Sequence, residues 1–147
     1  MSTVASITIT RQADYRFLVD FAPGMTQLLA DEPPPLGGAA GPSPSHMLLA
    51  AVANCLTASL TFALQKFKLD PGALCATATA TIERNGSNRL RIQHIDVAIQ
   101  LGVAGADLAH LDRALAQFEE FCTVSMSVRQ GIDIAVSVTD NSGAKLK

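Results

Sequence analysis

The stretch Ser43-Pro-Ser-His-Met-Leu-Leu-Ala-Ala-Val-Ala-Asn-Cys-Leu-Thr-Ala-Ser-Leu60 decides the fold, and it carries Cys55 in its second half. Ser43 suits the N-cap of a helix and Pro44 suits its first position, so we predict that a helix begins here. The helical pattern continues to about Lys68, where a Leu-Asp-Pro-Gly sequence ends it. Apolar side chains occupy most of the circumference, which is typical of a helix buried on several sides.

The residues before this helix predict strands and then an ordered loop. Residues 6–10 alternate between apolar and polar, and short apolar runs over residues 15–20 and 25–30 predict two more strands, with a first turn at residues 11–14. The segment Asp31–Pro44 is too rich in proline and glycine for a helix or a central strand. Many residues of restricted backbone conformation in one segment favour a rigid loop laid over a site rather than a mobile linker.

The residues after the helix predict a hairpin, a second helix and a last strand. Residues 73–83 and 91–101 alternate as two long strands, and Asn85-Gly86 between them is a strong hairpin signal. Leucines and a phenylalanine at helical spacing predict a helix over residues 107–121, and residues 132–138 alternate as a strand. The tail after Asp140 is expected to fray. This order predicts a single α+β domain over residues 1–147.

Composition excludes several classes of function. Of the 147 residues, 48% are hydrophobic and 16% are charged, which is typical of a globular domain. The net charge of −2 argues against nucleic acid as the main partner. No apolar run reaches the length of a membrane span, and the N-terminal residues lack the pattern of a signal peptide. We therefore expect a cytoplasmic, reducing compartment, where three cysteines do not form a disulfide scaffold.

The three cysteines are the candidates for chemistry. Cys75 lies in an alternating strand, where a buried, inert thiol is expected. By its position alone, Cys55 is also expected to be a buried, inert thiol. Cys122 follows the end of a predicted helix near a turn, which predicts a more accessible thiol. The spacing of the cysteines and the lack of a Cys-x-x-Cys sequence argue against a metal site, and we expect no bound cofactor.

Two sequences around these cysteines resemble motifs of the OsmC/Ohr superfamily (osmotically inducible protein C and organic hydroperoxide resistance proteins). In one, Pro44 is followed eleven positions later by Cys55; the other is Phe121-Cys-Thr-Val-Ser-Met-Ser-Val128. The loop that begins at Asp31 is similar to one common in the OsmC-like branch, and the element order agrees over nearly the whole chain. The resemblance implies antiparallel sheets wrapped around two central helices in an intertwined homodimer.

The resemblance also implies a thiol peroxidase that acts on organic hydroperoxides. Cys55 would be the peroxidatic thiolate, which attacks the O–O bond and becomes a sulfenic acid. Cys122 would be the resolving thiol, which condenses with it to a disulfide that a dithiol such as a lipoyl group later reduces. A resolving thiol of this kind protects the first cysteine from further oxidation.

The chain departs from the family at the group that activates the thiol. Burial raises the pKa of a thiol on an apolar helix face, so a nucleophile there needs a cation or strong donors beside it. In the hydroperoxidase branches an N-terminal arginine does this, held by a glutamate directly after the proline. Here that position is Ser45, followed by His46, which could itself act as a cation or simply be solvated. Arg16 is our candidate for the arginine, and Arg11 is the other one before the helix.

Two functions therefore stay open. The retention of both cysteines favours a hydroperoxide reductase. The missing glutamate favours a non-catalytic protein that binds a small ligand on the same scaffold, with cysteines that do little.

Overall fold

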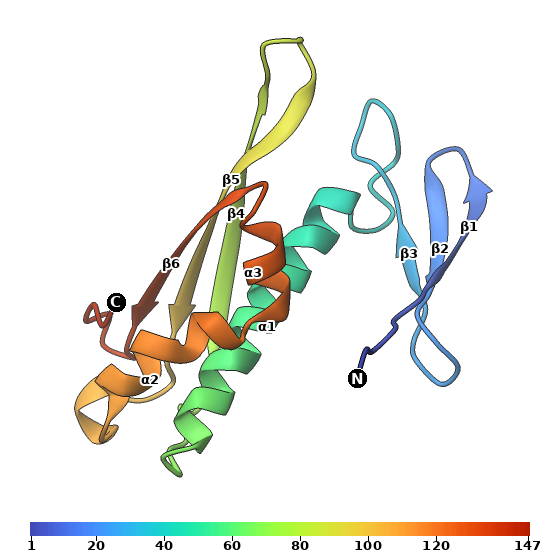
Figure 1. The fold of residues 1–147 in the computed structure, drawn as a ribbon. Helices are drawn as coiled ribbons and strands as arrows, with labels where there is room; N and C mark the ends of the chain where they lie inside the picture. The colour runs from blue at the N-terminus through green and yellow to red at the C-terminus, as the bar shows by residue number, and fades with distance from the viewer. The chain divides into compact units, whose positions relative to one another are not determined.

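The computed structural model describes residues 1–147 and forms two compact units, Met1–Leu48 and Leu49–Lys147 (Figure 1). Helix α1 (Pro44–Gln65) begins in the first unit and continues in the second. The single domain expected over residues 1–147 stays a prediction.

The N-terminal unit holds a three-stranded antiparallel sheet in the order β1-β2-β3. Its strands are β1 (Thr8–Ala13), β2 (Arg16–Asp20) and β3 (Leu28–Ala30), which confirms the three predicted strands. The turn expected at residues 11–14 is wrong, because β1 continues to Ala13. The chain reverses at Asp14, whose φ of 49° is a left-handed conformation that aspartate tolerates better than most residues.

The loop between β3 and α1 is organised by the buried side chain of Asp31. Its carboxylate accepts hydrogen bonds from the backbone N–H groups of Glu32 at 2.8 Å, Gly38 at 3.0 Å and Ala40 at 3.0 Å. The bond from Ala40 does most to lower the pKa of Asp31, against the opposing effect of burial. A Cβ at Gly41 would overlap the carbonyl oxygen of Leu29, so the loop passes too close to β3 for any side chain there. These contacts fix the loop, as the sequence predicts.

The C-terminal unit holds the second sheet, in the order β4-β5-β6. Strands β4 (Cys75–Arg84) and β5 (Leu90–Gln100) form the predicted antiparallel hairpin. Strand β6 (Asp133–Thr139) pairs with β5 in parallel, so the expectation of purely antiparallel sheets is wrong for this pair. The physical reason is the helical segment between β5 and β6, which returns the chain to the end of the sheet from which β5 started.

The helices lie on one face of this sheet (Figure 1). The alternation along β5 buries Ile95, Val97 and Ile99 and leaves Asp96 and Ala98 exposed. From α1, the core receives Val52, Leu56, Leu60, Ala63 and Leu64. This helix ends at Gln65, slightly before the predicted end. By length and composition alone α1 is apolar enough to cross a membrane, contrary to our expectation, although the core helix of a globular protein meets the same criterion.

The single helix predicted over residues 107–121 is wrong. The chain forms a short 3₁₀-helix η1 (Gly105–Asp107), then α2 (Leu111–Gln117), a second 3₁₀-helix η2 (Phe118–Phe121), and α3 (Thr123–Val128). His110 interrupts the helix with a φ of 61°. The predicted apolar positions are nevertheless all buried: Leu108, Leu111, Leu115 and Phe118. The sequence does not predict helix α3, because its six residues are rich in Ser, Thr and Val and have little intrinsic helix preference.

The C-terminal tail is held in place, so the expected fraying is wrong. The Asp140 carboxylate accepts hydrogen bonds from the backbone N–H groups of Gly105, Ser142 and Ala144 and from the Ser142 hydroxyl. The Ser142 hydroxyl is the largest of the influences that lower the pKa of Asp140 to about 2. Lys147 Nζ lies 2.6 Å from Glu119 Oε1 and donates to the Leu115 carbonyl at 3.1 Å.

Candidate functional site

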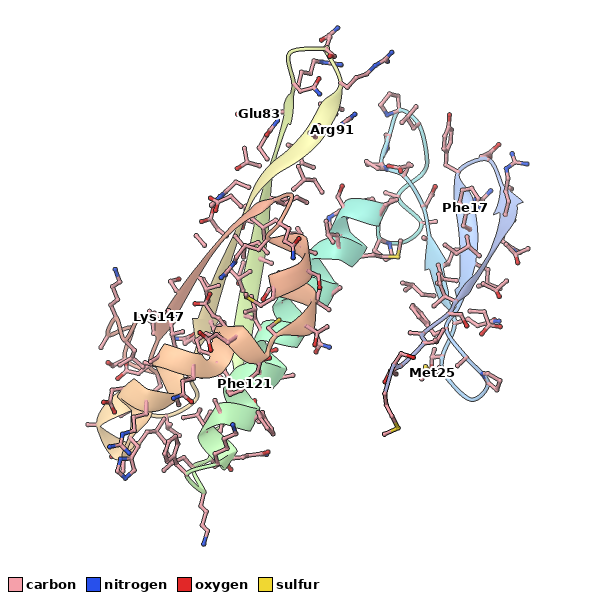
Figure 2. All side chains as sticks on the ribbon, in the orientation of Figure 1. Phe17, Met25, Glu83, Arg91, Phe121 and Lys147 are labelled. Atoms are coloured by element: carbon pink, nitrogen blue, oxygen red, sulfur yellow. The ribbon has the colours of Figure 1, made fainter.

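The thiols of Cys55 and Cys122 lie close together in the C-terminal unit, near enough for Cys122 to raise the pKa of Cys55, although the two residues are far apart in the sequence. Cys55 lies on α1, and Cys122 links η2 to α3 as the N-cap of α3. The neighbouring Phe121 lies beside α1, where its ring meets that of Phe62 edge to face at a centroid distance of 5.6 Å (Figure 2). The packing of the η2–α3 junction on α1 therefore brings the two sulfur atoms together.

The accessibility of the two thiols is the reverse of the prediction. Cys122 is fully buried, and Cys55 is partly exposed. Cys122 points inward because it is the N-cap of α3: its backbone is extended, and its sulfur accepts the N–H of Ser125 at 3.3 Å. A molecule that arrives from solvent would therefore meet Cys55 first.

The environment of Cys55 favours the neutral thiol. Burial is the largest influence that raises its pKa, and the neighbouring thiol of Cys122 raises it further. The backbone N–H groups of Val124 and Ser125 act in the opposite direction. The net result is a raised pKa, so the thiolate is a minor species at neutral pH unless another positive charge or donor assists.

Arg16, the predicted activating residue, lies on β2 in the N-terminal unit. Its guanidinium is 3.9 Å from the Asp14 carboxylate, and its charge also helps to lower the pKa of Asp31. All three residues line one hollow in this unit with Gly37 and Gly38 of the proline-rich loop. Arg16 thus has two acidic neighbours of its own. Arg11, in contrast, donates from Nε to the carbonyl of Asp14 at 2.9 Å and holds the β1–β2 turn.

His46 and Ser45, at the start of α1, do not reproduce the family's glutamate. Nδ1 of His46 lies 2.8 Å from the Ser43 hydroxyl and 3.3 Å from the backbone nitrogen of Ser43. The backbone nitrogen of His46 in turn lies 3.4 Å from the Ser43 hydroxyl oxygen. This is a reciprocal capping arrangement in which histidine occupies the place that glutamate or glutamine usually takes. His46 is therefore engaged in starting the helix.

An aromatic pair beside the thiols was missed by the sequence reasoning. Phe62 and Phe121 are 51% and 41% exposed, and Lys66 Nζ lies 4.8 Å and 4.1 Å from the centroids of their rings. Phe62 is two helical turns after Cys55, about 10 Å along the axis of α1, and Phe121 directly precedes Cys122. The position of Phe62 two helical turns after Cys55 and that of Phe121 directly before Cys122 are the sequence signals that could have indicated this apolar surface.

Cys75 and His94 lie on the other face of the second sheet. Cys75 is exposed, so the expectation of a buried thiol is wrong; the pleat of β4 turns it outward with Thr77 and Thr79. His94 bridges β5 and β6, with Nδ1 2.7 Å from Asp133 and Nε2 3.1 Å from Asp96. The hydrogen bond to Asp96 is the largest cause that raises the pKa of His94.

Nowhere in the structure do three His, Cys, Asp or Glu side chains gather in a geometry that could hold a metal ion.

Comparison with known proteins gives one family and one fold. The model of the OsmC-like protein family matches residues 37–137. An OsmC-like protein of unknown function from Vibrio cholerae superposes with a TM-score of 0.79 at 16% identity, over 94% of this chain and 100% of that one. An OsmC-like protein from Mycoplasma pneumoniae superposes with a TM-score of 0.78 at 18% sequence identity, over 95% of this chain and 99% of that one.

A third solved structure, an organic hydroperoxide resistance protein from Elizabethkingia anophelis, gives a TM-score of 0.73 at 19% identity, over 96% of this chain and 100% of that one. At these identities the likeness shows the fold. No curated protein matches the sequence.

Proposed function

Because the chain belongs to the family of OsmC-like proteins, we propose that it reduces organic hydroperoxides through Cys55 and Cys122. The observation that carries the proposal is the proximity of these two thiols, one partly exposed and the other buried. Two unrelated structural cysteines have no need to share a site. A nucleophilic thiol and the thiol that resolves it must do so.

The reaction uses only the two sulfurs, the peroxide and a dithiol. The Cys55 thiolate attacks the terminal oxygen of ROOH, the O–O bond breaks, and the alkoxide takes a proton to leave as ROH. Cys55 is then a sulfenic acid. The sulfur of Cys122 attacks the sulfur of Cys55, the S–O bond breaks, and water leaves as the disulfide forms. A dithiol, for example a lipoyl group, reduces this disulfide and becomes a cyclic disulfide itself.

Arg16 is proposed as the cation that favours the Cys55 thiolate. Its acidic neighbours Asp14 and Asp31 would orient the guanidinium, the task of the family glutamate that Ser45 replaces. A planar guanidinium that is always charged suits this role better than a histidine already engaged in helix capping.

The substrate is proposed to be an organic hydroperoxide rather than hydrogen peroxide. Phe62 and Phe121 place exposed apolar surface near the thiols. An alkyl or aryl group that contacts this surface removes more apolar area from water, and so binds more favourably, than the small polar hydrogen peroxide. Solved neighbours named organic hydroperoxide resistance proteins support the same choice. The test is consumption of cumene hydroperoxide by the reduced protein with dihydrolipoamide as reductant, and absence of consumption would contradict the function.

The second candidate is a protein that binds a small ligand without redox chemistry. The raised pKa of Cys55 favours it, because a neutral thiol is a poor nucleophile. An apolar hollow of about 240 Å³ in the N-terminal unit, lined by Ile9, Phe17, Val19 and Met47 among others, offers a place for a ligand. Thiols that stay reduced in the presence of cumene hydroperoxide would favour this candidate.

We propose further that the chain forms a homodimer in the reducing cytoplasm. Helix α1 leaves Ala50, Ala51 and Ala58 exposed, and an apolar helix of this length is normally covered on more than one side. A second copy of the chain is the proposed cover.

Sedimentation equilibrium at low micromolar concentration is expected to give about twice the mass of the 15.4 kDa chain. Replacing Ala51, another exposed residue of α1, by aspartate places a charge in the proposed interface and is expected to shift the mass toward that of the monomer. The exposed residue Thr79, on the far face of the second sheet, supplies the control Thr79→Asp. A parent protein that stays at 15.4 kDa would contradict the dimer.

A further inference from the structure

Ser125 carries a buried hydroxyl that has no hydrogen-bond partner. The residue is fully buried, and its Oγ is one of two buried side-chain polar atoms without a partner; the other is Nε of Arg129. An unsatisfied buried hydroxyl costs about 1–3 kcal/mol. Such groups are rare in native proteins, and each calls for a physical explanation.

Two other hydroxyls on the nearby helices show the usual partner of a helical serine or threonine. Ser127 donates to the carbonyl of Thr123 at 2.7 Å, one turn back in α3, and Thr61 donates in the same way to Thr57 in α1. Ser125 lies in the first turn of α3, so the carbonyl one turn back belongs to Phe121, which precedes the helix. The position of Ser125 thus removes the acceptor that a serine within a helix normally uses.

The Ser125 hydroxyl lies close to both thiols. The backbone N–H of the same residue donates to Cys122 Sγ at 3.3 Å and also acts on the Cys55 sulfur, together with the N–H of Val124. A serine Oγ lies at most about 3.7 Å from its own backbone nitrogen, which places the Ser125 hydroxyl within about 7 Å of Cys122 Sγ. Rotation about one side-chain bond carries it between three staggered positions in this space.

We propose that the Ser125 hydroxyl is a reserve hydrogen-bond donor of the Cys55 site, an inference that rests on the function proposed above. It has no partner while Cys55 is a neutral thiol. Once Cys55 ionises, the hydroxyl turns to the thiolate and joins the N–H groups of Val124 and Ser125 as a third donor. After the peroxide has reacted, it donates to the oxygen of the Cys55 sulfenic acid. The serine keeps its own proton throughout, so the balance of the reaction is unchanged.

A hydroxyl without a partner favours the Cys55 thiolate over the neutral Cys55 thiol, as catalysis requires. A donor already engaged by a thiol would stabilise both states, whereas a hydroxyl without a partner in the resting state gains its hydrogen bond only when charge develops. The titratable group that acts on Cys55 is Cys122, which disfavours the thiolate. The hydroxyl therefore offsets part of the effect of burial and of the second thiol.

Ser125→Ala tests the proposal, with Ser127→Ala as the matched control on the same helix. Both are made in a Cys75→Ser background, and the rate at which iodoacetamide alkylates Cys55 is followed against pH by mass spectrometry of the Cys55 peptide. Loss of one donor to the thiolate is expected to move the midpoint of the Ser125→Ala profile upward by about one pH unit. Ser127→Ala is expected to reproduce the parent profile. A Ser125→Ala profile that superimposes on the parent would overturn the proposal.

Ser125→Thr separates the hydroxyl from the shape of the side chain. This variant keeps the donor and is expected to keep the parent profile, while an upward shift equal to that of Ser125→Ala would overturn the role of the hydroxyl. Thermal unfolding followed by circular dichroism checks the fold. Ser125→Ala is expected to melt no lower than the parent, because it removes an unsatisfied polar atom from the interior.

Failure of this inference and failure of the proposed function are distinguishable. With cumene hydroperoxide at pH 7, Ser125→Ala is expected to form the Cys55–Cys122 disulfide roughly tenfold more slowly than the parent, the rate equivalent of one pH unit. If the parent itself forms no disulfide, the proposed function fails, while the two alkylation profiles still test the hydroxyl. If the parent reacts and Ser125→Ala reacts at the same rate, only the hydroxyl's role fails.

Discussion

Replacing Cys55 by serine is expected to reduce the consumption of cumene hydroperoxide to the uncatalysed rate, a loss of at least about a thousandfold. A serine hydroxyl at this position stays protonated and cannot form the sulfenic acid, so neither half of the reaction can proceed. The assay follows the remaining peroxide over time with dihydrolipoamide as reductant.

The other cysteines provide the controls. Cys75→Ser removes an exposed thiol from the far face of the second sheet and is expected to keep the parent rate. Cys122→Ser is expected to consume one equivalent of peroxide rapidly and a second one slowly and then to stop, because the Cys55 sulfenic acid has no resolving partner and oxidises to the sulfinic acid. A Cys55→Ser variant that turns over like the parent would remove Cys55 from the mechanism, and a slow Cys75→Ser variant would move the chemistry to the exposed thiol.

Arg16→Ala belongs in the same series. If Arg16 favours the thiolate, the variant is expected to react more slowly at pH 7 and to recover as the pH rises, since higher pH ionises Cys55 without help. Arg11→Ala is the matched control, because this residue holds a turn. An Arg16→Ala rate that equals the parent rate at every pH would remove Arg16 from the site.

Replacing Phe118 by alanine is expected to lower the free energy of unfolding by about 3–5 kcal/mol. Phe118 is fully buried at the start of η2, directly before the junction that places Cys122. The Nζ of Lys147 lies 5.2 Å from its ring centroid, so the ring also supports the C-terminal tail. Truncation removes these contacts and leaves a cavity that the surrounding helices and sheet fill only in part.

Urea denaturation followed by circular dichroism measures this loss. Phe21→Ala is the matched control, because Phe21 is 37% exposed and follows the end of β2; it is expected to cost about 1 kcal/mol or less. A loss below 1 kcal/mol for Phe118→Ala, or an equal loss for the two variants, would show that the buried ring of Phe118 does not stabilise the core.

The sequence predicts the strands and the long helix well because their periodicities are simple. The alternation of β4 and β5 and the cap at Ser43 depend on neighbouring residues alone. The region after β5 was harder, since Leu108, Leu111, Leu115 and Phe118 would be buried equally by one helix or by a chain of short ones. The break at His110 is a backbone conformation that no spacing of apolar residues reveals.

The interactions that determine the site join residues distant in the sequence, and this limited the prediction. The pairing of Cys55 with Cys122 came from the family resemblance, and the burial of Cys122 follows from packing of the η2–α3 junction that the sequence alone does not show. The ordered tail has the same origin, because Asp140 and Lys147 bind groups more than thirty residues away. The unpartnered hydroxyl of Ser125 is visible only when every neighbouring donor and acceptor is in place.

The most direct test of the central claim is to treat the fully reduced protein with about one equivalent of cumene hydroperoxide and to map the products by mass spectrometry. The account predicts rapid formation of a Cys55–Cys122 disulfide, with Cys75 left as a free thiol. Unreacted Cys55 and Cys122, or oxidation confined to Cys75, would contradict it and favour the small-ligand-binding protein.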